Sequence, residues 1–139
     1  MEQIMKTDNK IKTYKDLNIW QNGMEIVEII YKSTSTFPKE ELYGITSQIR
    51  RAALAMPSNI SEGFERNHIK EYIQFLYIAK SSAGELHTLL EIANRIGYLQ
   101  KNHFEMISLK ITNFRKMTGS LIQKLKLRSS TTFVLEQAP

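Results

Sequence analysis

The sequence predicts an all-α protein that folds as an up-down antiparallel four-helix bundle. Apolar residues recur at alternating spacings of three and four through most of the 139 residues, which is the period of a helix buried on one face. Proline- or glycine-containing breaks divide this pattern into four stretches, and no strand-like alternation competes with it. Short links make consecutive helices antiparallel. The length suits one domain, and 42% hydrophobic residues suffice for one core.

The first helix is predicted to begin at Asp16 as its N-cap, after a flexible lead at residues 1–15. Phe37-Pro38 is predicted to end this helix, because helical backbone angles are unfavourable for the residue before a proline. Its expected buried seam, which includes Trp20 as a structural residue, is Leu17, Trp20, Met24, Val27, Tyr31 and Thr34.

The second helix is predicted to start at Pro38, with Glu40 and Glu41 favouring its positive end. Its expected seam is Leu42, Ile45, Ile49, Ala52, Met56, Ile60 and Gly63.

Pro57 falls inside this second helix and predicts a kink or a break. It lacks an N–H and crowds the carbonyl of Ala53. We expect Ser58, Asn59 and Ser61 to satisfy the freed backbone groups through their side chains.

The third helix is predicted to start at Asn67 or His68 and to end at Gly97, which fits a C-cap. The fourth is predicted from about Asn102 to Leu127, so the bundle spans residues 16–127 and a flexible tail follows at 128–139. The third helix's expected seam is Tyr72, Leu76, Ala79, Ala83, Leu86, Leu90 and Ala93. The fourth helix's expected inward residues are Phe104, Ile107, Ile111, Phe114, Thr118, Leu121 and Leu125.

The composition excludes several classes of protein. No cysteine is present, which excludes disulfides and cysteine-ligated metals and agrees with a cytoplasmic location. No long uncharged apolar run predicts a transmembrane helix, and the polar N-terminus lacks the apolar centre of a signal peptide.

The net charge of +5 is confined to the C-terminal part of the chain. Residues 1–100 hold twelve basic and twelve acidic residues, whereas residues 101–139 hold seven basic residues against Glu105 and Glu136. A basic segment attracts polyanions such as nucleic acid. The alternative is a solvated basic face that serves solubility.

Several blocks of the sequence resemble the four helix bundle proteins that are also called 23S rRNA intervening-sequence proteins. The most specific blocks are QIRRAA at residues 48–53 and PSNI at residues 57–60, followed by Glu62-Gly63. Further blocks are YKDL at residues 14–17 and GYL at residues 97–99. The resemblance covers residues 14–127 and marks Pro57, Asn59, Gly63 and Gly97 as structural positions.

The resemblance implies a bacterial-type protein that is not an enzyme and uses no cofactor or metal. It also implies a homo-oligomer, a homopentamer, that associates with RNA or DNA. Some relatives are encoded within ribosomal RNA genes, and others resemble accessory proteins of diversity-generating retroelements, which bind a reverse transcriptase. The alternative to nucleic-acid binding is therefore a protein-interaction scaffold, for example for a reverse transcriptase.

The candidate phosphate-binding surface combines an arginine pair of the second helix with basic residues of the fourth. Arginine suits phosphate because its planar fork donates two parallel hydrogen bonds. For one arginine of the pair, an ion pair with Glu62, Glu85 or Glu91 is the alternative. The candidate residues are Arg50, Arg51, Lys110, Arg115, Lys116, Lys124 and Lys126.

Aromatic stacking and catalysis have weaker support. Most aromatic residues lie at core spacing, and Tyr77 and Tyr98 are the expected exposed exceptions. His87 and Glu91 share a helix face, but two ligands make a weak metal site. A ribonuclease is the least favoured alternative, since Arg66 or Arg95 with His68 or His103 matches no known motif spacing.

Overall fold

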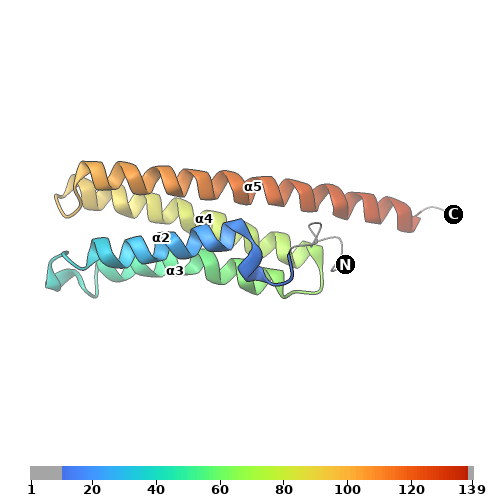
Figure 1. The fold of residues 1–139 in the computed structure, drawn as a ribbon, viewed down its shortest axis with the longest axis horizontal. Helices are drawn as coiled ribbons and strands as arrows, with labels where there is room; N and C mark the ends of the chain where they lie inside the picture. Colours follow the sequence, from blue (N-terminus) through green and yellow to red (C-terminus); the bar gives the residue numbers. More distant parts are fainter. Residues whose placement is uncertain (1–10, 138–139) are drawn as a thin grey trace.

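The computed structural model describes residues 11–137, and their side chains as far as Ser130. Two short 3-10 helices, η1 (Tyr14–Asp16) and η2 (Lys39–Glu41), accompany four long helices. The long helices are α2 (Asn18–Thr34), α3 (Ile45–Phe64), α4 (Ile69–Arg95) and α5 (Lys101–Gln137). They run antiparallel in sequence order, which confirms the predicted up-down bundle (Figure 1).

Each long helix packs on its sequence neighbours, and α5 closes the bundle against α2. The seam between α3 and α4 is the most extensive and the seam between α2 and α5 the least. The predicted end of the last helix at Leu127 is wrong, because α5 continues to Gln137 and projects past the other helices (Figure 1). Among residues 11–137, no helix combines the length and apolarity needed to cross a bilayer.

The entry into α2 differs from the prediction that Asp16 is an N-cap. Thr13 is the N-cap of η1, and Asp16 is the third residue of a capping box. The Asp16 carboxylate accepts backbone hydrogen bonds from Lys12 at 2.8 Å and Thr13 at 3.0 Å, which lower its pKa. Of the lead predicted at residues 1–15, residues 1–10 lie outside the described part of the chain.

The predicted buried face of α2 is confirmed at its two ends, where Leu17 and Thr34 are buried, but not between them. Met24 and Tyr31 are 36% and 40% exposed, and Trp20 is half-buried with its ring edge-on to Tyr14. Gly23 lies where α2 approaches α3, because a Cβ there would meet the ring of Pro57 at 3.4 Å. The residues of α2 that are buried are Ile19, Gly23, Ile26, Ile30 and Thr34.

Helix α3 begins later than predicted and passes through Pro57 without a break. Residues 39–41 form η2, and α3 starts only at Ile45. Asn59 Nδ2 donates to the Ala55 carbonyl at 2.7 Å, so this side chain does not serve the Ala53 carbonyl that Pro57 leaves unpaired. Pro57 itself is buried, so the core holds the helix together around the missing hydrogen bond.

Helix α4 agrees most closely with the prediction. It begins at Ile69 with His68 at its N-cap position. Gly97 follows its end with φ of +88°, a backbone angle that glycine adopts without strain. The buried residues of the predicted seam are Tyr72, Leu76, Ala79, Ala83, Leu86, Leu90 and Ala93, all of them 0% exposed.

Candidate nucleic-acid interface

A surface groove of about 520 Å³ lies between α4 and α5, and we call it the basic groove. Lys80 enters it from α4, and Arg115 and Lys116 enter it from α5. The full lining is Tyr77, Lys80, Arg115, Lys116, Gly119, Ser120, Ile122 and Gln123. Three cations from two helices therefore face one elongated hollow.

Small residues give these long side chains room. A Cβ at Gly84 would lie 3.7 Å from the guanidinium of Arg115, and a Cβ at Gly119 would lie 3.4 Å from the ammonium of Lys80. Each long cation thus lies across a glycine of the opposite helix. Because these two positions have no side chain, the charged ends of Arg115 and Lys80 can lie along the surface where α4 meets α5.

A fourth cation stands at one end of the basic groove. The Lys126 ammonium lies 5.1 Å from the centre of the Tyr77 ring, a cation-π distance. Tyr77 is 41% exposed, as expected for one of the two tyrosines outside the core. An exposed aromatic ring beside cations is the combination that single-stranded nucleic acid uses for stacking.

These four cations have no ion-pair partner among the residues whose side chains the structure describes. Among residues 11–130, Lys80, Arg115, Lys116 and Lys126 form no salt bridge. No acidic residue occurs between Glu105 and Glu136, so α5 offers them no acidic partner along this stretch. Their charge is therefore available to an external anion.

Lys110 differs from its neighbours on α5. Its Nζ lies 2.7 Å from Glu25 Oε1, an ion pair that joins α5 to α2 on the other side of α5. A second hollow of about 410 Å³ is lined by both residues of this pair, and Lys116 lines both hollows. Lys124 is exposed but does not line the basic groove.

Arg50 sits in a different environment. Its Nε donates to Thr34 Oγ1 at 3.0 Å, and its guanidinium lies 4.7 Å from the centre of the Tyr31 ring. Two of the three acidic partners considered for the arginine pair are engaged elsewhere, since Glu62 binds Arg66 and Glu91 binds Arg95. Arg51 is exposed.

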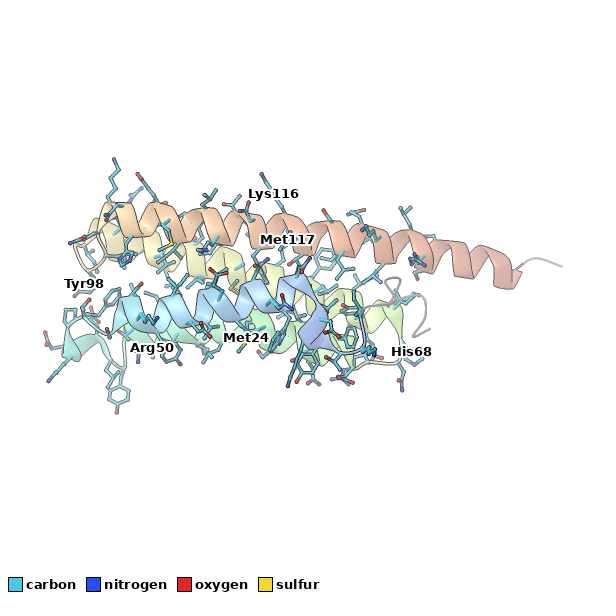
Figure 2. The ribbon with its side chains drawn as sticks, in the orientation of Figure 1. Met24, Arg50, His68, Tyr98, Lys116 and Met117 are labelled. Atoms are coloured by element: carbon cyan, nitrogen blue, oxygen red, sulfur yellow. The ribbon has the colours of Figure 1, made fainter. Side chains whose placement is uncertain are left out.

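The predicted surface that joins Arg50 and Arg51 to the last helix does not form within this chain. Arg50 contacts Thr34, near the end of α2, whereas Lys110 contacts Glu25. The contact with Thr34 places Arg50 level with the end of α2, and the contact with Glu25 places Lys110 level with its middle. Arg115 lies further along α5, away from Arg50. At 1.5 Å per residue, the steps from Thr34 to Glu25 and from Lys110 to Arg115 separate Arg50 from Arg115 by about 20 Å along the bundle. Figure 2 shows Arg50 beside α2 and α3, and Lys116 on α5 at the opposite edge of the bundle.

Tyr98 is half-buried, so the expectation that it is exposed was wrong. Its hydroxyl donates to Glu41 Oε2 at 2.9 Å, and its ring lies 5.6 Å from that of Phe37. The hydrogen bond to Glu41 raises the pKa of Tyr98. These contacts tie the loop after α4 to the segment around η2.

The histidines do not assemble a metal cluster in the described part of the chain. No group of three or more potential metal ligands occurs there. His87 stacks on Phe104 with ring centres 5.8 Å apart, while Glu91 binds Arg95 at 2.7 Å. His87 and Glu91, which share a helix face, thus make two separate contacts.

Sequence reasoning missed Lys80, Gly84 and Gly119. The acid-free stretch of α5 and the small residues on both helices were visible signals. Which α4 residues face which α5 residues depends on the register of the two helices, and helical spacing alone does not fix it.

A family model described as 23S rRNA-intervening sequence protein matches residues 15–120. A crystal structure of a protein of unknown function from the S23 ribosomal protein family of Bacteroides thetaiotaomicron is also similar, with a TM-score of 0.68. The two chains are 24% identical over 75% of this chain and 97% of that chain, a likeness that shows the fold alone. A comparison with curated proteins finds no match. The family match covers most of the chain, and the protein belongs to the 23S rRNA-intervening sequence protein family.

Proposed function

We propose that the protein binds the phosphate backbone of RNA or DNA along the basic groove and is not an enzyme. The observation that carries this proposal is a set of four cations in or beside one groove, Lys80, Arg115, Lys116 and Lys126, which form no ion pair among residues 11–130. Neutralising phosphates releases the counterions condensed on nucleic acid, which is a favourable and strongly salt-dependent contribution.

The groove favours backbone binding over base recognition. Its charged groups are flexible lysines and one arginine, which position a nucleic acid without reading its sequence. Tyr77 adds a ring on which an unpaired base can stack. We therefore expect broad sequence tolerance and a preference for nucleic acid that has unpaired bases.

Fluorescence anisotropy with labelled structured RNA and duplex DNA tests the proposal. With four phosphate contacts per chain, affinity should fall roughly 50- to 150-fold between about 50 and 200 mM salt. Replacing Arg115 and Lys116 by Gln should lower the slope of log affinity against log salt by about 0.7 to 0.9 per cation removed.

The matched control is the pair Lys32→Gln and Lys70→Gln, which makes the same change in net charge at exposed positions outside the groove. This control should leave the salt slope unchanged. An equal loss in both double variants would make the effect one of net charge and would reject the groove as the site.

Self-association is a second part of the proposal. Several apolar side chains are open to solvent, with Tyr43 at 93%, Leu109 at 65% and Ile96 at 52% exposed. Burial of such side chains stabilises subunit contacts, and the family resemblance suggests a homopentamer, which would repeat the basic groove around a ring. Native mass spectrometry distinguishes a single chain of 16.2 kDa from a fivefold assembly.

A protein-interaction scaffold that works in the cytoplasm is the second candidate function. Tyr43 and its neighbour Leu42, which is 45% exposed, favour this function because they are adjacent apolar residues just before the start of α3. Binding to a reverse transcriptase that survives nuclease treatment and is lost in Leu42→Ser with Tyr43→Ser would support the scaffold over the nucleic-acid proposal.

A further inference from the structure

A small pocket of about 300 Å³ lies away from the basic groove, between the end of α2 and the start of α3. Phe37, Pro38 and Leu42 supply apolar walls. Lys39, Thr46 and Arg50 supply polar groups. The pocket is therefore a mostly apolar hollow with polar side chains on both sides.

The charged groups that line this pocket, Lys39 and Arg50, are both cations, and no carboxylate lines it. Thr34 is already satisfied, because its hydroxyl donates to the Ile30 carbonyl at 2.8 Å and accepts from Arg50 Nε at 3.0 Å. The Thr46 hydroxyl is buried, with the residue 3% exposed, and it has no hydrogen-bond partner among the described residues. A buried hydroxyl without a partner is costly, but its oxygen is closed off from the pocket, so Arg50 is the main donor there.

Arg50 is held in place, and its two terminal nitrogens remain available to donate hydrogen bonds. The stack on Tyr31 and the bond from Nε to Thr34 fix the plane of the guanidinium. Neither terminal nitrogen of Arg50 takes part in an ion pair or hydrogen bond among residues 11–130. Glu41 does not line the pocket, and one of its carboxylate oxygens accepts from the Tyr98 hydroxyl.

We propose that this pocket binds a carboxylate attached to a short apolar group. The Arg50 fork would donate to the carboxylate oxygens, and the Lys39 ammonium would add positive charge. Phe37, Pro38 and Leu42 would contact the apolar group. The volume suits a small molecule, and the two cations that line the pocket, with no carboxylate beside them, disfavour a cationic ligand.

This inference is independent of the proposed nucleic-acid binding. Arg50 is about 20 Å along the bundle from Arg115, at 1.5 Å per residue. A change at Arg50 should leave the salt slope for RNA unchanged, and removal of Arg115 and Lys116 should leave the pocket intact. The two proposals therefore fail separately.

NMR titration of the full chain with 3-methylbutanoate tests the inference. We expect saturable shifts of the Arg50 Nε–H and Thr46 amide signals, with a dissociation constant on the order of 1 mM. The neutral 3-methylbutanamide serves as the matched probe and should give no saturable shift. Inorganic phosphate, which has no apolar part, should bind more weakly than 3-methylbutanoate.

Two variants separate binding from folding. Arg50→Gln removes the charge, and Thr46→Val replaces the unpaired hydroxyl by a methyl group of similar size. Arg50→Gln should weaken 3-methylbutanoate at least about tenfold, the loss expected for one charge-assisted hydrogen bond. Thr46→Val should also keep or raise the stability of the free protein, because it removes a buried polar atom that has no partner.

Three results would overturn the inference. One is the absence of saturable shifts with 3-methylbutanoate. Another is binding of the amide or of phosphate at least as tight as that of the carboxylate. The third is unchanged carboxylate binding in a folded Arg50→Gln protein.

Discussion

The two sides of α4 use glycine in opposite ways. On the side of α3, a Cβ at Gly63 would lie 2.7 Å from Phe75 Cβ and 3.0 Å from the Tyr72 ring, so the backbone of α3 lies directly against α4. On the side of α5, the space beside Gly84 and Gly119 holds the ends of Arg115 and Lys80. One seam excludes any side chain at its glycine, and the other leaves room for charged ones.

This difference separates the part of the bundle that holds the fold from the part available for binding. Close approach at the α3–α4 seam buries Tyr72 completely, and the loss of water raises the pKa of its hydroxyl. At the α4–α5 surface, the charged ends of Lys80 and Arg115 line an open groove. Stability and binding thus rest on different faces of one helix.

The largest effect is expected from Gly63→Ala. The new methyl group overlaps Phe75 and Tyr72, and we expect a loss of about 1 to 3 kcal/mol in the free energy of unfolding. This loss should appear although alanine favours helix more than glycine does. Urea denaturation followed by circular dichroism measures it, and a variant as stable as the parent would show that α3 and α4 do not touch here.

Gly97→Ala probes a glycine whose role is conformational rather than steric. Nothing lies within 4 Å of a Cβ at this position, but φ is +88°. The expected cost is therefore roughly 1 to 2 kcal/mol of backbone strain alone. Gly97→Asn is the control and should recover part of that loss, because asparagine tolerates left-handed angles better. Thermal melts of the three proteins would contradict this reasoning if alanine and asparagine behaved alike.

Gly84→Ala should have the opposite sign from Gly63→Ala. Its Cβ would make ordinary contact with Arg115 at 3.7 Å, so the higher helix propensity of alanine should add about 0.5 to 1 kcal/mol of stability. Nucleic-acid affinity should stay within a factor of about two, well below the loss expected for one phosphate contact. Destabilisation in the same urea assay would mean that the basic groove is as tightly packed as the α3–α4 seam.

The smallest effect is expected for the ion pair between Lys110 and Glu25. Both side chains are partly exposed, at 37% and 52%, so a double-mutant cycle to Gln should give a coupling of roughly 0.2 to 1 kcal/mol that fades with salt. Lys110→Gln should also reduce RNA affinity less than Lys80→Gln does, since Lys110 is already paired. If Lys110→Gln reduced RNA affinity more than Lys80→Gln, the binding surface would lie on the α2 side of α5 instead.

Much of the fold follows from the sequence because it depends on local patterns. The seven residues of the α4 seam were predicted at a spacing that leaves one continuous buried stripe, and all seven are buried. Gly97 was predicted at the end of α4 from its conformational freedom. The basic excess of the last helix was predicted from charge counting, and three of its residues, Arg115, Lys116 and Lys126, lie in or beside the basic groove.

The prediction for α2 failed because this helix carries apolar residues on two adjacent stripes. Met24 and Tyr31 fit the helical period as well as Ile26 and Ile30 do, and periodicity does not rank the two stripes. The packing of α2 against α3 decides which stripe is buried, because the stripe that contains Gly23 lets α2 approach Pro57 closely. The continuity of α3 through Pro57 has a similar origin, since burial against neighbouring helices outweighs one missing hydrogen bond.

The sequence by itself determined the four helices, the glycine that ends α4 and the basic character of α5, since each depends on residues close together in the chain. The tertiary structure alone decided which face of α2 is buried, which α4 residue joins the cations of α5, and that Arg50 stands apart from them. These features depend on the register and rotation of helices against one another. Packing of whole surfaces sets that register and rotation, and no local spacing encodes them.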